Sequence, residues 1–228
     1  MFSRENISEA FNAAIPIMLG YVAIGLPCGI LSASIGMNAL QVLMISVLLY
    51  SGAGQFMLPN MWLALSPLAS IVASISLVNT RQMLYSASFA PWCRGAGKLL
   101  SFWFAASVTD ESFGVNMQKF LDGGWSVEKA TLVNEFSHSS WTISCVLGVF
   151  LGNALGIPLA IAAFAMTSIF ICLMVTQKVT PENVVAAACA MVGVVVCKLV
   201  GLAGPAILVG ALVGVASAMV FASLRRAR

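Results

Sequence analysis

The stretch SVLLYSGAGQFMLPNMWLALSPLASIVASISLVNTRQMLYSASFA, residues 46–90, decides how the chain folds. Most of it is apolar enough to cross a membrane as helix, yet it contains strongly polar side chains, among them Gln55, Asn79, Arg81 and Gln82. An arginine at the centre of a lipid-embedded helix costs about 2.5–3.5 kcal/mol on insertion scales. Because a chain rarely carries this cost without a carboxylate, a watery cavity or a substrate for the charge, the stretch is predicted to be the working part of a membrane protein.

The composition of the whole chain also indicates a membrane protein. Of its 228 residues, 60% are hydrophobic and 8% are charged, whereas soluble domains average about 25% charged residues. One span needs about 20 residues to cross a hydrocarbon core of about 30 Å. The predicted fold class is therefore all-α: a polytopic integral membrane protein with 7–8 transmembrane helices, some broken at Gly or Pro, in a single membrane domain over residues 1–228.

The spans are predicted from apolar runs that alternate with short polar connections. They lie near residues 13–35, 39–58, 67–89, 99–115, 131–151, 159–176, 184–200 and 205–224. Outside them, residues 1–12 are predicted to be a cytoplasmic lead-in, residues 116–130 the longest polar loop, and residues 224–228 a basic cytoplasmic tail. The glycine pair at 123–124 predicts a turn within that loop.

The distribution of basic residues predicts the orientation. Eight spans put both termini on one side, together with seven basic residues: Arg4, Lys119, Lys129, Lys178, Arg225, Arg226 and Arg228. The opposite side holds three at most: Arg94, Lys98 and Lys198. Because positive residues stay in the cytoplasm, both termini are predicted to be cytoplasmic. If segment 99–115 does not cross, the C-terminus moves to the other side.

The second predicted span ends in a glycine-rich segment. Gly52 and Gly54 flank Ala53, Gln55 follows, and Pro59 is expected to close the segment. Unwound backbone at membrane depth is tolerated only against protein or a water-filled cavity, and transporters use broken helices to hold substrate carboxylates and coupling ions. Gly52, Gly54 and Gln55 are therefore candidate substrate-binding residues, with an ordinary glycine-rich helix end as the alternative.

The third predicted span carries the buried arginine. Arg81 and Tyr85 share one helical face because they are four residues apart. Asn79 lies about 200° around a regular helix from Arg81, so the helix is either packed by protein on both sides or broken near residues 78–81. Asn79, Arg81 and Tyr85 are candidate substrate-binding residues. For Arg81 the alternative is a structural ion pair or a side chain that snorkels to the interface.

The fourth predicted span contains two adjacent carboxylates, Asp110 and Glu111. Both are candidates for proton coupling or for an ion pair, since charges inside a membrane are functional by default. Adjacent side chains point about 100° apart on a helix, so at most one is expected to face Arg81. The alternative is that this segment is short, re-entrant or outside the bilayer, which would leave both carboxylates in water.

Other reactive side chains form no recognisable site. Six scattered cysteines include no CxxC and no Cys/His cluster, so no metal, cofactor or disulfide framework is predicted: Cys28, Cys93, Cys145, Cys172, Cys189 and Cys197. Glu135 and His138 are spaced to pair on one helical face. Four tryptophans are expected at the membrane interfaces: Trp62, Trp92, Trp125 and Trp141.

Several function classes lack their sequence signals. No basic stripe is interleaved with aromatic residues, so no nucleic-acid partner is predicted. No nucleotide-binding, HExxH or GxSxG motif occurs, so the chain is not predicted to be an enzyme. From the residues alone, the hypotheses are a secondary transporter, a non-transporting assembly subunit, or an intramembrane channel.

Four motifs resemble the AzlC-type azaleucine-resistance family, the large subunit of a two-component branched-chain amino acid exporter. They are SGAGQF at 51–56, LVNTRQMLYSAS at 77–88, TDESFG at 109–114 and GVFLG at 148–152. The N-x-R-x-x-L-Y pattern within the second motif is the most specific. Gln82 stands where many relatives have histidine, which weakens a proton-transfer role at that position.

The resemblance implies what the residues alone do not. It implies export of leucine, isoleucine or valine, with methionine as a further substrate, across the inner membrane of a bacterium. It also implies a small multi-span partner subunit of the AzlD type. The site residues are inferred from physical chemistry and are not carried over from the family.

Overall fold

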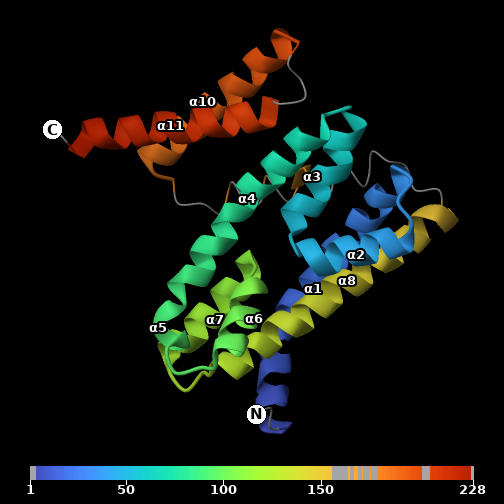
Figure 1. Cartoon of the computed structure of the whole chain (residues 1–228), viewed down its shortest axis with the longest axis vertical. Helices are drawn as coiled ribbons and strands as arrows, with labels where there is room; N and C mark the ends of the chain where they lie inside the picture. The colour runs from blue at the N-terminus through green and yellow to red at the C-terminus, as the bar shows by residue number, and fades with distance from the viewer. Residues whose placement is uncertain are drawn as a thin grey trace. The chain divides into compact units, whose positions relative to one another are not determined.

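The structure is a computed structural model that describes residues 4–155, 164, 167–168, 171, 175, 179–201 and 206–226. Every element named in this part of the chain is an α-helix. This confirms the all-α class for the described residues (Figure 1). Most of the sixth predicted span, including Cys172, lies outside them, as do Lys178 and Arg228.

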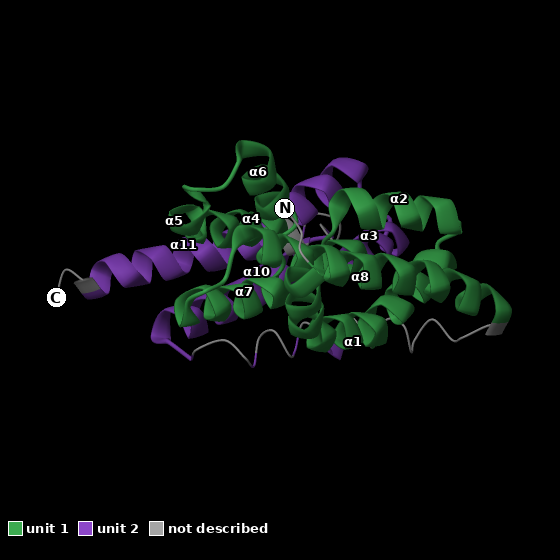
Figure 2. Ribbon diagram, turned by 90° about the horizontal axis from the view of Figure 1, so that it is seen from below, with its two compact units in different colours: residues 1–56, 78–166 green, residues 57–77, 167–228 purple. Residues whose placement is uncertain are grey.

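The chain divides into two compact units (Figure 2). The first contains residues 1–56 and 78–166, and the second contains residues 57–77 and 167–228. Two helices pass from one unit to the other: α3 (Gly52–Leu63) and α4 (Leu68–Ser88). All the candidate site residues belong to the first unit.

The first unit is built on α1 (Arg4–Ser34) and α8 (Val127–Leu155), which lie side by side in Figure 1. Ser140 on α8 donates to the Met18 carbonyl, and about two to three turns further along both helices Gly29 meets Gly148. The contacts advance together along the two helices, so α1 and α8 run parallel. Residues 4–12 belong to α1 itself and form no separate element before the first span.

Glycines allow the backbones of α1 and α8 to approach closely. A Cβ atom on Gly29 would overlap the Cys145 carbonyl oxygen, and one on Gly148 would overlap the Leu26 carbonyl oxygen. Helices in membranes gain much of their association energy from such small-residue contacts. The α1–α8 pair is therefore the rigid frame against which the other helices of the unit pack.

The second predicted span is broken into α2 (Ala39–Leu49) and α3. The break falls at Tyr50, whose φ of 35° and ψ of 59° are left-handed. The prediction that Pro59 closes the segment is wrong, because Pro59 lies inside α3, which continues to Leu63. Proline is tolerated inside membrane helices where neighbouring groups compensate for the lost backbone hydrogen bond.

The third predicted span is one helix, α4, so the hypothesis of a break near residues 78–81 is wrong. After the short α5 (Ala90–Cys93), the fourth predicted span divides into α6 (Lys98–Ala106) and α7 (Asp110–Asp122). The unit thus contains two broken segments, one at Tyr50 and one at residues 107–109.

The predicted polar loop at 116–130 is largely helical. Its first part belongs to α7 and its last part to α8, and only residues 123–126 connect them. The predicted glycine turn is confirmed, with φ of 87° at Gly123 and 74° at Gly124. The loop prediction failed because α7 has an amphipathic surface whose polar residues resemble those of a loop.

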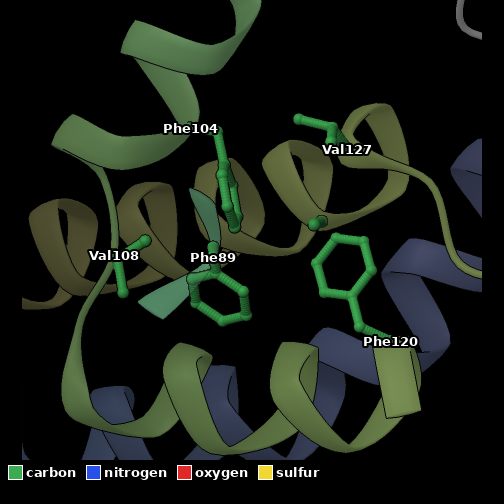
Figure 3. Close-up of a cluster of buried hydrophobic side chains, with 6 residues drawn as sticks. Phe89, Phe104, Val108, Phe120 and Val127 are labelled. Atoms are coloured by element: carbon green, nitrogen blue, oxygen red, sulfur yellow. The ribbon is translucent and has the colours of Figure 1, made fainter. Parts of the chain in front are cut away.

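A cluster of buried aromatic side chains holds the end of α4, α6, α7 and the start of α8 together. Phe89 packs edge-on against Phe104, and its ring centroid lies 5.6 Å from that of Phe120 (Figure 3). Beside them the buried Asn116 donates to Asn134, which in turn donates to Ser107. These contacts fix the break between α6 and α7.

In the second unit, α10 (Pro181–Leu199) and α11 (Ala206–Arg226) form an antiparallel hairpin. Gly193 approaches Gly210, and the ion pair of Glu182 with Arg225, at 2.8 Å, joins the start of α10 to the end of α11. Among the described helices, α1 and α10 are long and apolar enough to cross a membrane as single spans. Large apolar side chains are exposed over both units, as is typical of a lipid-facing surface.

Candidate functional site

The break between α2 and α3 is held by side chains from other helices. His138 Nε2 lies 3.0 Å from the Ser46 carbonyl oxygen, and Gln82 Nε2 donates to the Tyr50 carbonyl at 3.4 Å. Ser51 Oγ accepts from the Gly54 N–H at 3.1 Å and so caps the start of α3. A helix end leaves backbone groups without partners, and here α4 and α8 supply part of what is missing.

Gln55 is buried and both ends of its amide are occupied. Its Nε2 donates to Ser46 Oγ at 2.8 Å, and its Oε1 accepts from Trp141 Nε1. The Trp141 ring also covers Gly52, where an added Cβ would lie 3.5 Å from the ring. Gln55 and Gly52 therefore shape the site and hold α3 on α8, and Gln55 has no free amide atom to offer in this conformation.

The interface position predicted for Trp141 is wrong, since its side chain is 2% exposed. We expect Trp141→Phe to lower the free energy of unfolding by about 1–3 kcal/mol, because it leaves the buried Gln55 oxygen without a donor. The midpoint of thermal unfolding in detergent measures this. Trp62→Phe, at an exposed tryptophan, is the control and should unfold as the wild type does; equal midpoints for the two variants would contradict the prediction.

The helix α4 makes polar contacts on two sides. This agrees with the sequence hypothesis that the helix is packed by protein on both sides. Ser51 Oγ donates to Asn79 Oδ1 at 2.6 Å on one side. On the other, Arg81 Nη2 pairs with Asp110 Oδ2 at 2.8 Å. Tyr85, one turn after Arg81, stacks on Phe113 of α7 with ring centroids 4.5 Å apart. The α4 polar residues thus connect the two helix breaks of this unit.

The Arg81–Asp110 pair is only half satisfied. Its side chains are 30% and 22% exposed. Arg81 Nε and Asp110 Oδ1 are buried and have no hydrogen-bond partner. Buried polar groups without partners are rare and point to a functional role or a missing ligand. The pair therefore offers one free donor on a cation and one free acceptor on an anion, side by side.

The carboxylates of α7 point to different partners. Thr109 caps the helix by a reciprocal pair of hydrogen bonds with Ser112, and Asp110 and Glu111 occupy the first turn, where the helix dipole favours negative charge. Asp110 faces Arg81, whereas Glu111 accepts a hydrogen bond from Tyr21 of α1 at 2.7 Å. As the helical geometry predicted, only one carboxylate faces the arginine.

The predicted pairing of Glu135 with His138 is wrong. Glu135 accepts from Trp103 Nε1 of α6 at 2.6 Å. The His138 ring stacks on Tyr50, with centroids 3.9 Å apart. Helices packed against α8 provide better placed partners than the neighbouring turn does.

Sequence reasoning missed the hydroxyl groups of the site. Tyr21, Tyr50, Ser51 and Thr109 all lie at or beside the two breaks. One signal was available: the T-x-x-S spacing at 109–112 is typical of a helix N-cap. Tyr21 lies 88 residues from Thr109 in the chain, and no local pattern predicts that contact. In the described part of the chain, no group of three or more His, Cys, Asp or Glu side chains is placed to hold a metal ion.

Comparison with known proteins identifies the family. Residues 16–155, more than half of the chain, match the family described as AzlC protein. The chain belongs to the AzlC family. AzlC is a family of transport proteins and not of enzymes, so this chain is a membrane protein with a transport role.

Three relatives cover most of the chain. The "Branched-chain amino acid transport protein AzlC" of Bacillus subtilis (strain 168) is 28% identical over 186 residues, 78% of this chain and 71% of the relative. The "Inner membrane protein YgaZ" of Escherichia coli (strain K12) is 27% identical over 169 residues, which are 71% of this chain and 69% of the relative. A membrane protein of Helicobacter pylori (strain ATCC 700392 / 26695) is 28% identical over 176 residues, 77% of each. No solved structure matches the chain.

Proposed function

We propose that this protein is the large subunit of a two-component secondary transporter that exports branched-chain amino acids. The substrates are leucine, isoleucine and valine, with methionine as a further one, and the membrane is the inner membrane of a bacterium. The name of the Bacillus subtilis relative supports the substrate class, and that of the Escherichia coli relative supports the membrane.

The observation that carries this proposal is the half-satisfied pair of Arg81 and Asp110 between two broken helices. An amino acid carries a carboxylate that needs a cationic donor and an ammonium group that needs an anionic acceptor. Arg81 Nε and Asp110 Oδ1 are such groups and have no other partner. Tyr85 and the ring it stacks on supply apolar surface for a branched side chain.

The other predicted residues take supporting roles in this proposal. Gly52, Gly54, Gln55 and Asn79 form the frame that fixes the first helix break beside the substrate. Glu111 is the second acidic group and the candidate for coupling. The Arg81–Asp110 pair closes on itself when the site is empty and opens when substrate binds. In this way the ion pair between Arg81 and Asp110 is replaced by two ion pairs with the substrate, one between Arg81 and its carboxylate and one between Asp110 and its ammonium group.

We further propose eight spans with both termini in the cytoplasm. The parallel direction of α1 and α8 supports this count, because two parallel spans require an odd number of crossings between them. Three segments supply these crossings. The first consists of α2 and α3 together, the second is α4 alone, and the third consists of α6 and α7 together. The hairpin of α10 and α11 adds two further spans, and the count of eight includes the span predicted from the sequence at 159–176, most of which lies outside the described residues.

The partner in this proposal is a small AzlD-type membrane subunit, and no nucleic acid takes part. The test uses purified protein in liposomes loaded with leucine, with and without that subunit. Leucine exchange only when both subunits are present is the expected result. Exchange without the small subunit would contradict the two-component arrangement. No exchange in either case would favour a non-transporting assembly subunit and overturn the transport proposal.

A further inference from the structure

A second polar cluster, consisting only of oxygen atoms, lies beside the Arg81–Asp110 pair. Tyr21 donates its hydroxyl proton to Glu111 Oε2 at 2.7 Å. The same Tyr21 oxygen lies 2.8 Å from Thr109 Oγ1. Because Tyr21 has a single proton and gives it to the carboxylate, Thr109 is the donor in the second hydrogen bond. This cluster joins α1 to the start of α7.

The Tyr50 hydroxyl is directed into the same cluster. It lies close to the Tyr21 and Thr109 hydroxyl groups and near Glu111, but no partner is placed to complete a full hydrogen bond with it. The Tyr50 side chain is only 7% exposed, so its hydroxyl is a buried polar group that lacks a partner. Its backbone is left-handed, with φ of 35°, which is rare for a bulky residue and typical of strained functional positions.

The cluster leads from an accessible carboxylate to a buried hydroxyl. Glu111 is exposed, whereas Tyr21 and Thr109 are buried. Each tyrosine hydroxyl can donate one hydrogen bond and accept others. When a proton enters on Glu111, the neutral acid donates a hydrogen bond to the Tyr21 oxygen, and the Tyr21 hydroxyl group turns to donate to the Tyr50 oxygen. The entering proton stays on Glu111, and each tyrosine keeps its own.

Several ionisable groups face this cluster from the surrounding helices. They are Tyr21 on α1, Tyr50 at the end of α2, Arg81 and Tyr85 on α4, Asp110 on α7, and Glu135 and His138 on α8. Asp110 is committed to Arg81 and Glu135 to Trp103. The His138 Nε2 atom is occupied by the Ser46 carbonyl. Glu111 is therefore the carboxylate whose partners are hydroxyl groups alone.

We propose that Glu111 binds either a proton or the ammonium group of the substrate, and that Tyr21 and Tyr50 stabilise the protonated acid by reorienting their hydroxyl groups. This inference rests on the proposed function and names its coupling ion. The charges of Asp110 and Glu111 both act on the Tyr85 hydroxyl, so a substrate ammonium group held on that side of Asp110 is attracted by Glu111 as well. Its Oε2 atom is held by Tyr21, which leaves the other carboxylate oxygen for the ammonium or the proton.

Competition for one carboxylate makes the transporter an exchanger. Protonation removes the negative charge that attracts the ammonium group, and a bound ammonium group stabilises the ionised carboxylate and expels the proton. By linkage, each ligand lowers the affinity for the other by the same factor. Export of one amino acid is then exchanged for entry of one proton, and an inward proton gradient drives the substrate out.

The test is proton release on substrate binding. The full chain is purified with its small subunit in weakly buffered detergent, and leucine is added to saturation while bound leucine and released protons are both counted. The measurement covers about pH 4 to about pH 8, the range in which glutamate and histidine side chains of proteins ordinarily titrate. We expect the wild type to release up to about one proton per leucine at the pH of maximal effect.

The variant Glu111→Gln keeps an acceptor for Tyr21 but cannot hold the proton. We expect it to bind leucine more weakly and to release no protons at any pH. Glu128→Gln, at an acidic residue in the first turn of α8, is the matched control and should keep the wild-type ratio. Leucine binding without proton release in the wild type would overturn the inference and leave the proposed function intact. No leucine binding at all would overturn both.

One further variant and one change of buffer examine whether another residue or another ion is involved. If His138→Gln releases no protons while Glu111→Gln releases as many as the wild type, then His138 is the proton-binding residue and the proposal is overturned. Replacement of sodium by choline in the buffer distinguishes coupling to protons from coupling to sodium. If leucine binds only when sodium is present and releases no protons, the site binds sodium and the proposed proton site is contradicted.

The role of the two tyrosines is tested by removing single hydroxyl groups. Tyr50→Phe deletes a buried hydroxyl and keeps the ring that stacks on His138. We expect leucine efflux driven by a pH gradient to slow about twofold to about tenfold, since the protonated site loses one hydrogen bond, while the number of protons released per bound leucine is retained because Glu111 is intact. Tyr21→Phe should behave in the same way. Wild-type efflux rates in both variants would overturn this role of the tyrosines.

Discussion

Replacement of Arg81 by alanine should slow leucine export severely. The expected loss is about tenfold to about a hundredfold in the efflux rate, since a hydrogen bond to a charged group contributes about 1.5–3 kcal/mol. The variant loses the donor for the substrate carboxylate and leaves Asp110 without its partner at 2.8 Å. The measurement is leucine efflux from cells that are preloaded with a leucine-containing dipeptide and that also express the small subunit.

Membrane abundance must be compared in the same cells, because a chain that fails to insert also fails to export. Arg94→Ala, at an exposed arginine after α5, is the matched control and should export as the wild type does. The exchanged pair Arg81→Asp with Asp110→Arg should restore part of the activity lost in either single variant. Full activity of Arg81→Ala alone would exclude Arg81 from the transport path.

A single methyl group on Gly29 should disrupt the frame of the first unit. In Gly29→Ala the new Cβ meets the Cys145 carbonyl oxygen, which belongs to the backbone of α8 and cannot rotate away. Overpacking of this kind costs about 1–3 kcal/mol and occasionally more. Gly148→Ala should have the same effect because its Cβ meets the Leu26 carbonyl oxygen.

Replacement of Gly20 by alanine should have the opposite effect on the stability of the folded protein. Gly20 lies on α1 with no heavy atom within 4 Å of its added Cβ, and alanine is a better helix former than glycine by about 0.8–1.0 kcal/mol. Thermal unfolding in detergent should therefore show a lower midpoint for Gly29→Ala and an equal or higher one for Gly20→Ala. Equal midpoints for both variants would mean that α1 and α8 do not pack as closely as described.

The sequence predicted the parts of the site that local rules govern. The bounds of α4 agree with the apolar run at 67–89. The chain breaks beside the SGAGQ segment. The angle between neighbouring side chains on a helix correctly limited Arg81 to one carboxylate partner. Each of these follows from composition and helical geometry over fewer than about 25 residues, which is the scale of one span.

The remaining features depend on contacts between distant segments. The break falls on Tyr50 and not on a glycine, because His138 stacks on its ring and Gln82 holds its carbonyl. The hydroxyl cluster forms because Tyr21 on α1 reaches Glu111 on α7, which lies 90 positions later in the chain. Such contacts join residues about 30 to 90 positions apart, and sequence periodicity carries no information on them.

Leucine binding compared with two analogues tests the central claim most directly. The purified chain, with its small subunit, is titrated calorimetrically with leucine, with 3-methylbutylamine, which lacks the carboxylate, and with 4-methyl-2-oxopentanoate, which lacks the ammonium group. If Arg81 and the α7 carboxylates hold the zwitterion, leucine binds and each analogue binds about tenfold or more weakly, because each leaves a charged group of the site unpaired. Equal affinities for all three ligands would show that the side chain alone is recognised and would contradict this assignment of the site.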